Sequence, residues 1–194
     1  MNPLLAQTHF WGTGSEWFWA FMQFLAVAFT LFLIYLQIRV QTASHVVQSL
    51  STIHTRWNSE SMLRVRQHVC SKWINGSRDF DGVAQYLAEF MEELGTYLRI
   101  KAVKDREMWE VQSWYIEHYY LMFKKGIEQY RQTYKDESLY SQFQLLFKRM
   151  RKMDRKQHSP HFSGSEQELM AFAKTELDVV NAVLKLKTSS RDVG

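Results

Sequence analysis

Trp17 to Leu36 reads WFWAFMQFLAVAFTLFLIYL, a run of 20 residues without a charged side chain. At about 1.5 Å of rise per residue, a helix of this length spans roughly 30 Å, the thickness of the hydrocarbon core of a bilayer. A helix that is apolar on all sides is unusual in a soluble protein, where one face meets water. The stretch therefore predicts a membrane-spanning helix, and the lipid bilayer is its first expected partner.

Aromatic residues lie toward both ends of this run in the manner of interfacial belts, with Trp11, Trp17 and Trp19 at one end and Tyr35 at the other. A cleaved signal peptide carries a basic segment before its apolar core, and residues 1–38 contain no Lys or Arg. We therefore expect the helix to be retained as an anchor rather than removed.

The basic residues predict the orientation of the anchor. All 24 Lys and Arg residues lie from Arg39 onward. Because basic flanks of membrane helices stay on the cytoplasmic side, this asymmetry predicts an extracytoplasmic N-terminus. Residues 1–15 are then a short outer segment, and the chain after the anchor lies in the cytosol.

A polar stripe runs along the predicted anchor, because Glu16, Gln23, Thr30, Gln37 and Ser44 recur at strict seven-residue intervals. Seven residues turn a helix by about 700°, so each group lies only about 20° behind the previous one. Polar groups on one face of a membrane helix usually face another helix or water. The open interpretations are helix association through hydrogen bonds, a water-filled lumen inside a ring of copies, and chance. Gln23, Thr30 and Gln37 are the candidate residues that face the oligomer or the pore.

The rest of the chain predicts an all-α domain, because only 2 Pro and 8 Gly occur in 194 residues and no alternating β-branched run is present. We expect a transmembrane and juxtamembrane helix over 16–55, a cytosolic bundle of about five helices over 56–187, and a flexible tail over 188–194. The residues expected to cap the bundle helices are Ser59 or Asn58, Asp81, Asp105, Asp136, and Ser165 in a capping box with Glu168.

No signature of a catalytic or cofactor site is found in the sequence. It contains no phosphate-binding loop, nucleotide fingerprint, zinc-protease motif or nucleophile–histidine–acid set. The single cysteine, Cys70, lies in an apolar stretch, which favours a buried structural thiol over a nucleophile. A metal site formed by Glu117, His118 and a distant partner is the alternative to solvated or core histidines. We expect no metal, no cofactor and no enzyme activity.

The order of features resembles an uncharacterised bacterial membrane family, domain of unknown function 4760, over roughly residues 15–155. The residues that carry the resemblance are Trp57, Ser59, Met62 and Arg66, then the stretch Phe90-Met91-Glu92-Glu93-Leu94-Gly95, and then Tyr140, Phe143 and Leu146. The resemblance implies one N-terminal membrane helix followed by a helical domain rich in aromatic residues. It brings no established catalytic residues.

A basic run near the C-terminus consists of Lys148, Arg149, Arg151, Lys152, Arg155 and Lys156. The spacing from Arg151 to His158 resembles the Arg-x4–6-His pattern of HEPN-type ribonucleases, which are all-helical and use the pair at a scissile phosphate. This resemblance implies an RNA-binding or RNA-cleaving domain, but Lys152 stands where that pattern has an Asn or Asp after the Arg. The other interpretations are a solvated basic face and contact with anionic lipid headgroups.

The leading hypothesis is a non-enzymatic, self-associating membrane protein that works as an oligomeric channel or a membrane-perturbing effector. A role in antiviral defence follows only by analogy with small bacterial effectors that join one membrane helix to a helical sensor domain. The alternatives are a membrane-tethered RNA-binding or RNA-cleaving domain and a structural adaptor for a cytosolic protein partner. The expected location is the bacterial inner (cytoplasmic) membrane, crossed once, and the expected assembly is a homo-oligomer.

Overall fold

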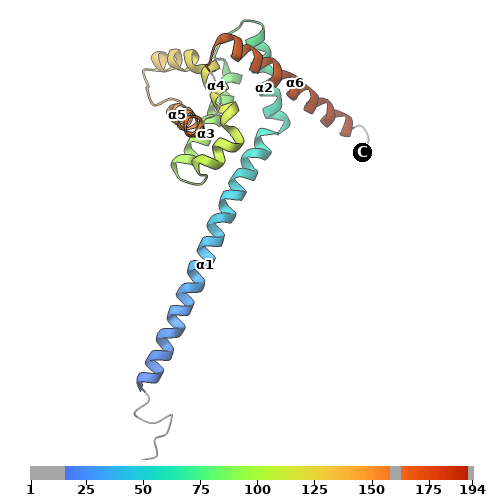
Figure 1. Ribbon diagram of the computed structural model, residues 1–194. Helices are drawn as coiled ribbons and strands as arrows, with labels where there is room; N and C mark the ends of the chain where they lie inside the picture. The colour runs from blue at the N-terminus through green and yellow to red at the C-terminus, as the bar shows by residue number, and fades with distance from the viewer. Residues whose placement is uncertain (1–15, 158–162, 192–194) are drawn as a thin grey trace, which may run out of the picture. The chain divides into compact units, whose positions relative to one another are not determined.

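The computed structural model describes residues 16–157 and 163–191, which form helices and contain no strand. The helices are α1 (Glu16–Trp57), α2 (Glu60–Ile74), α3 (Gly82–Arg99), α4 (Asp105–Tyr134), α5 (Ser141–Lys156) and α6 (Glu166–Arg191) (Figure 1). The prediction of an all-α fold with an apolar N-terminal helix is confirmed. The expectations for residues 1–15, His158 and residues 192–194 lie outside the described residues.

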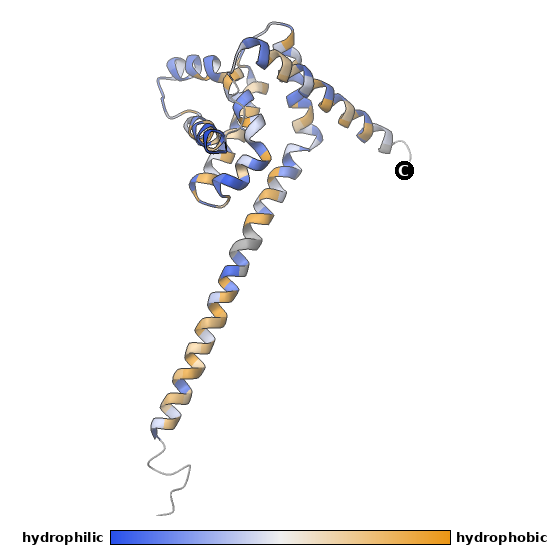
Figure 2. Ribbon diagram, viewed as in Figure 1, coloured by the Kyte–Doolittle hydropathy of each residue, from blue (hydrophilic) through white to orange (hydrophobic). Residues whose placement is uncertain are grey.

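The first part of α1 contains the segment predicted to enter the bilayer. Glu16–Arg39 is long enough and apolar enough to cross a membrane, and none of its apolar window is buried inside the chain. Figure 2 shows hydrophobic residues all along this part of α1. The chain divides into two compact units, Met1–Val47 and Gln48–Gly194. The second unit therefore contains the last turns of α1 together with α2 to α6.

The second unit has one hydrophobic core. Within it, α2 packs along α6, and α5 packs against both α3 and α4. The largest fully buried side chains are Met62, Leu63, Leu87, Phe90, Met91, Leu94, Met108, Ile116, Tyr119, Ile127, Phe143 and Leu146. The end of α1 belongs to this core, because Ile53 and Trp57 are buried and Trp57 stacks on Phe90 with ring centroids 5.6 Å apart.

Three of the predicted helix caps are confirmed. Ser59 and Asp81 each accept the backbone N–H of the third residue that follows, at 3.3 Å and 2.9 Å. Ser165 Oγ accepts the N–H of Glu168 at 3.3 Å, and Glu168 accepts the N–H of Ser165 at 3.2 Å, which completes the capping box. The helix that this box opens continues to Arg191, past the boundary expected at residue 187.

Two predicted helix starts were wrong. Asp105 is the first residue of α4 rather than its cap, and the N–H of Lys104 donates to Glu107 at 2.8 Å. Asp136 closes a local turn by accepting the N–H and the hydroxyl of the residue two positions later, and α5 begins only at Ser141. A short Asp side chain bonds to such a turn as readily as to a helix, so its presence alone does not fix where the helix begins.

The N-terminus of α5 is capped by a side chain of α3. Tyr140, the residue before α5, has a left-handed backbone (φ 55°), and its side chain makes no capping hydrogen bond. Instead, the Glu92 carboxylate accepts the N–H groups of Gln142 at 3.0 Å and of Phe143 at 2.6 Å. Near it on α3, Gly95 gives α5 room to approach, because a Cβ at this position would lie 2.5 Å from the Gln142 carbonyl oxygen.

We expect Gly95→Ala to lower the free energy of unfolding by roughly 1–3 kcal/mol, because the added methyl meets backbone rather than a flexible side chain. The measurement is helical circular dichroism of the full chain in mild detergent during thermal or denaturant unfolding. Gly82→Ala is the matched control, since a Cβ at this first residue of α3 meets nothing within 4 Å. Equal stability of the two variants would contradict the close approach of α3 and α5.

Candidate functional site

The predicted membrane stripe contains two side-chain amides without partners in the described chain. Gln23, Thr30 and Gln37 are all exposed on α1. The Thr30 hydroxyl donates to the carbonyl of Ala26 in its own helix at 2.8 Å, so it needs no further partner for its hydrogen. Gln23 and Gln37 make no side-chain hydrogen bond within the described residues. The side chain of Ser44, the stripe's last predicted member, is outside what the structure describes.

The basic run on α5 divides into two groups. Arg149 pairs with Asp105 at 3.2 Å, and Arg151 pairs with Glu117 of α4 at 3.5 Å. The other four side chains are exposed and have no ion pair among the described residues: Lys148, Lys152, Arg155 and Lys156. The six residues therefore do not form one cationic surface, because two of them hold α5 to α4.

Only the arginine of the Arg–His pair expected for a ribonuclease lies among the described residues. Arg151 is 26% exposed at its side chain, pairs with Glu117, and lies over the ring of Phe147 at 5.5 Å. His158 lies outside the described residues. An arginine that binds a phosphate at a cleavage site must present its donors to the substrate, whereas this guanidinium faces a buried carboxyl group. The ribonuclease interpretation of Arg151 and His158 therefore stays a prediction.

The carboxyl group of Glu117 is the most strongly perturbed acid of the bundle that the structure describes. Burial, followed by a hydrogen bond to Asp154, raises its pKa from 4.5 to about 8, although Arg151 acts in the opposite direction. Its buried Oε1 faces no donor among the described residues. A proton on Glu117 turns this carboxyl group into a donor to Asp154, whose Oδ1 already accepts the indole N–H of Trp109 at 2.7 Å. The raised pKa therefore keeps the Glu117 carboxyl group largely protonated at neutral pH.

His118, the neighbour of Glu117, is a packed and uncharged histidine. Burial lowers its pKa to about 4, its Nδ1 donates to the carbonyl of Trp114 at 2.6 Å, and its ring stacks on Phe172 with centroids 4.3 Å apart. No group of three or more His, Cys, Asp or Glu side chains with metal-binding geometry occurs among the described residues. This part of α4 does not present Glu117 and His118 as a pair of ligands.

A buried ion pair joins α2 to α6 in the core. Nε of Arg66 donates to Glu176 at 2.6 Å, and Nη1 donates to the carbonyl of Trp57 at 3.2 Å. The Tyr119 hydroxyl also donates to Glu176, at 3.1 Å. Because each charge is paired and hydrogen-bonded, this cluster has the character of a structural element rather than a reactive site.

The thiol of Cys70 lies beside this cluster, 3.6 Å from the Tyr119 hydroxyl. It is fully buried, and burial raises its pKa to about 12. The expectation of a buried structural thiol is confirmed, since a nucleophilic cysteine needs an accessible thiolate.

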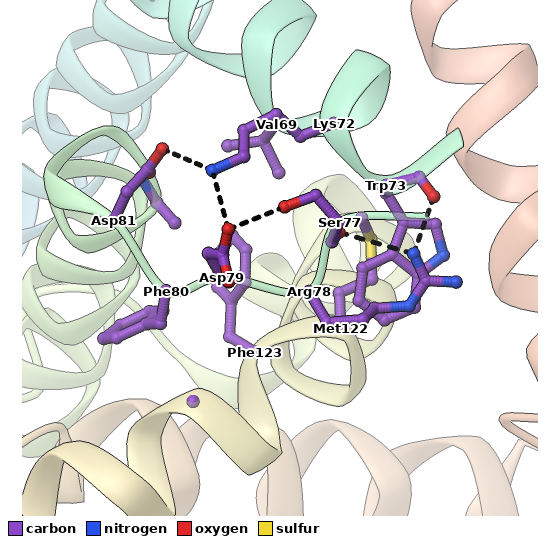
Figure 3. Close-up of a pocket in the computed structure, with 12 residues that line it drawn as sticks. Val69, Lys72, Trp73, Ser77, Arg78, Asp79, Phe80, Asp81, Met122 and Phe123 are labelled. Atoms are coloured by element: carbon purple, nitrogen blue, oxygen red, sulfur yellow. Dashed lines mark hydrogen bonds and ion pairs between the residues drawn. The ribbon is translucent and has the colours of Figure 1, made fainter. Parts of the chain in front are cut away.

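Two hollows in the bundle have polar walls whose side chains are bonded to each other. The cavity in Figure 3 measures about 20 Å³, enough for about one water, and lies where the α2–α3 connection meets α4. Figure 3 shows Lys72 reaching both Asp81, at 2.8 Å, and Asp79, at 3.8 Å. A larger open groove of about 310 Å³ lies between α2 and α6, where Gln67 donates to Asn181 at 2.7 Å. Neither hollow offers a set of convergent, unpaired groups for a ligand.

No protein-family model, curated protein or solved structure matches this chain. Membership of domain of unknown function 4760 therefore stays a prediction.

The residues that carry the predicted family resemblance form structural contacts. Arg66 lies over the Trp57 ring at 4.0 Å, and Phe90 stacks on the same ring. Glu92 caps α5, and Gly95 admits its backbone. These residues therefore stabilise the packing of the helices, and they do not indicate a reactive or ligand-binding group.

Replacing Glu117 by Gln should flatten the dependence of stability on pH. The folded-state pKa is raised from 4.5 to about 8, so the contribution of protonated Glu117 is complete at low pH and is lost as the pH rises through about 8. Wild-type protein should thus unfold more easily at pH about 9 than at about 6, and Glu117→Gln should lose less over this range. The measurement is the unfolding midpoint in detergent as a function of pH.

Glu110→Gln is the control for this experiment, because Glu110 lies on the same helix but pairs at the surface with Arg106. It should keep the wild-type pH dependence. A wild-type slope in Glu117→Gln would mean that Glu117 is not the group whose proton stabilises the bundle.

Proposed function

We propose that this chain is a non-enzymatic protein of the bacterial inner membrane whose copies associate through the membrane helix and form a channel or a membrane-perturbing assembly. The observation that carries the proposal is the pair of exposed amides, Gln23 and Gln37, which lie in the apolar segment of α1 and have no hydrogen-bond partner among the described residues. The bundle from Gln48 onward is then the cytosolic part that holds copies together or receives a protein partner.

The physical reason lies in the cost of an unpaired amide in lipid. Hydrocarbon offers no hydrogen-bond partner, so an amide facing lipid loses the bonds that it makes with water. A second helix supplies them, and each such bond contributes about 0.6–2 kcal/mol. Repeated at two levels and around a ring of copies, these bonds favour one register of association. A ring of amides also offers water a polar wall, which is the basis for proposing a channel.

The orientation is proposed from the distribution of charge. No Lys or Arg precedes Arg39, while all 24 follow from there, so the positive-inside rule favours an external N-terminus and a cytosolic bundle. A defence function rests on analogy alone.

Changing Gln23, Thr30 and Gln37 together to Leu should leave membrane insertion intact, because the segment only becomes more apolar. It should weaken oligomerisation in mild detergent and abolish dye release from liposomes that contain the protein. Phe24→Leu, a change beside the stripe, is the control and should alter neither property. If the wild-type protein releases no dye, the channel hypothesis is wrong and the adaptor hypothesis remains. If the triple variant releases as much dye as the wild type, the stripe does not line the path that the dye takes through the membrane.

The orientation is tested with single cysteines, since the native Cys70 is buried. Pro3→Cys should react with a membrane-impermeant thiol reagent in intact spheroplasts, and Ser190→Cys should react only after the membrane is permeabilised. The opposite pattern would overturn the cytosolic placement of the bundle.

A further inference from the structure

One face of α5 in the second unit carries a concentration of exposed basic side chains. At about 100° per residue, four of them lie within about 100° of one another on the helix surface, opposite the buried Phe143, Leu146 and Met150. None of the four forms an ion pair among the described residues. They are Lys148, Lys152, Arg155 and Lys156. The positive charge of this face is therefore not offset by acids in contact with it.

The α3–α4 connection adds two more cations at the same end of the bundle. Arg99 and Lys101 are exposed, and they flank Ile100, which is 62% exposed. The connection leads into Asp105 at the start of α4, and Asp105 pairs with Arg149 of α5 at 3.2 Å. Arg149 is the direct neighbour in the chain of the first of the four α5 cations. The connection and the basic face of α5 therefore lie at one end of the second unit.

The backbone at Lys101 has a conformation that is unfavourable for a lysine. Its φ is 60°, in the left-handed region where glycine is favoured at the end of a helix. The turn closes α3, because the N–H groups of Lys101 and Ala102 donate to the carbonyls of Leu98 and Tyr97 at 3.2 Å and 3.0 Å. The side chains at the tip of this turn are exposed and add nothing to the core. Such a local cost without a packing gain is typical of a functional segment.

We propose that the four α5 cations, together with Arg99, Ile100 and Lys101, bind the surface of a bilayer that contains anionic lipid. This set of residues is called the basic end below. Exposed cations are attracted to an anionic leaflet within about a Debye length, and an aliphatic side chain that enters the headgroup layer strengthens such binding. Ile100 is the residue that enters, and the cations around it pair with lipid phosphates. The proposal rests on the proposed membrane anchor and does not require that copies associate.

The length of chain after the anchor favours lipid as the partner. The candidate membrane span ends at Arg39, and the second unit begins at Gln48, nine positions later. Even a fully extended chain of this length reaches only about 30 Å, at about 3.5 Å per residue. With the anchor inserted, the second unit stays beside the membrane, where lipid headgroups are present at high effective concentration.

Nucleic acid is the other polyanion that a basic surface attracts. Proteins that bind single strands commonly stack the bases on exposed aromatic rings. The basic end contains no aromatic residue, and its exposed apolar residue, Ile100, is aliphatic. An aliphatic side chain between two cations suits the boundary between headgroups and acyl chains better than it suits a stacked base. The composition of the basic end therefore favours a lipid surface over RNA.

Fluorescence of the full chain in lipid nanodiscs tests this contact. Ile100→Cys is given an environment-sensitive label, while the native Cys70 is buried and stays unlabelled. Emission of the label should rise severalfold and shift to the blue when phosphatidylglycerol is added to phosphatidylcholine nanodiscs, and the rise should shrink at high salt. Val179→Cys, a 47% exposed aliphatic position on α6, is the matched control and should not respond. No response at residue 100, or an equal response at residue 179, would overturn the proposal.

Charge reversal tests whether the cations of α5 drive the contact. A triple variant with Lys148→Glu, Lys152→Glu and Arg155→Glu should lose the response of the label at residue 100. The control variant makes the same change of charge at three exposed lysines elsewhere, Lys124→Glu, Lys125→Glu and Lys135→Glu, and should keep the response. Helical circular dichroism checks that both variants fold. A response that persists in the first variant would contradict the proposed role of the α5 cations.

The same experiment separates this inference from the proposed function. Protein that does not enter nanodiscs of either composition would overturn the anchor, and this inference with it. Protein that inserts as single copies and still responds to phosphatidylglycerol would contradict only the proposed association of copies. A labelled RNA oligonucleotide is the second probe. RNA binding that the α5 charge reversal removes, without any lipid response at residue 100, would overturn the lipid contact and assign the basic end to nucleic acid.

Discussion

The buried ion pair between Arg66 and Glu176 is the contact on which the assembly of the bundle depends. Both side chains are almost fully buried, at 3% and 4% exposure, and the pair joins α2 to the C-terminal helix α6. Removing one charge would leave the other buried without a partner, which commonly costs about 3–5 kcal/mol. The hydrogen bonds from Tyr119 and to the Trp57 carbonyl extend the constraint to α4 and to the end of α1. Four helices are thus fixed by one polar cluster inside an otherwise apolar core.

The same cluster makes the end of α1 an integral part of the bundle. The Arg66 guanidinium lies 4.0 Å from the centre of the Trp57 ring, and the same ring stacks on Phe90 of α3. A cation held against an aromatic face in a buried setting stabilises both groups. Rotation of the last turn of α1 therefore disturbs the ion pair and the aromatic stack together. This restricts which face of α1 remains exposed in the second unit, and so determines that Gln48 and Thr55 lie outside the core.

Local signals explain which features the sequence could predict. The helices follow from apolar periodicity, and the caps at Ser59, Asp81 and Ser165 follow from side chains that bond within three residues. The start of α5 could not be found this way, because its cap, Glu92, lies on another helix, about 50 positions earlier in the chain. Such a cap forms only where two helices lie close together in the fold, and a local sequence pattern does not contain that information.

The α5 basic run shows the same limit in the candidate site. In the sequence its six cations are equivalent, whereas in the fold Arg149 forms an ion pair with Asp105, Arg151 contacts the Glu117 carboxyl group, and the remaining four face solvent. The acid pair of Glu117 and Asp154 also arises only when α4 meets α5. By contrast, the membrane stripe was predictable, because helical periodicity alone determines which residues share a face.

The hydrogen bonding along the stripe also bears on the proposed association of copies through the membrane helix. The Thr30 hydroxyl donates its hydrogen bond within its own helix. Midway between Gln23 and Gln37, the stripe therefore has no donor that needs a partner from another helix. The two amides are about 21 Å apart along the axis, which puts them toward opposite sides of the apolar layer. In the proposed assembly, hydrogen bonds between copies are then strongest at the two levels of Gln23 and Gln37. The proposal therefore puts the register of the helices at these two levels, and puts the passage of water at Thr30, whose oxygen still accepts hydrogen bonds.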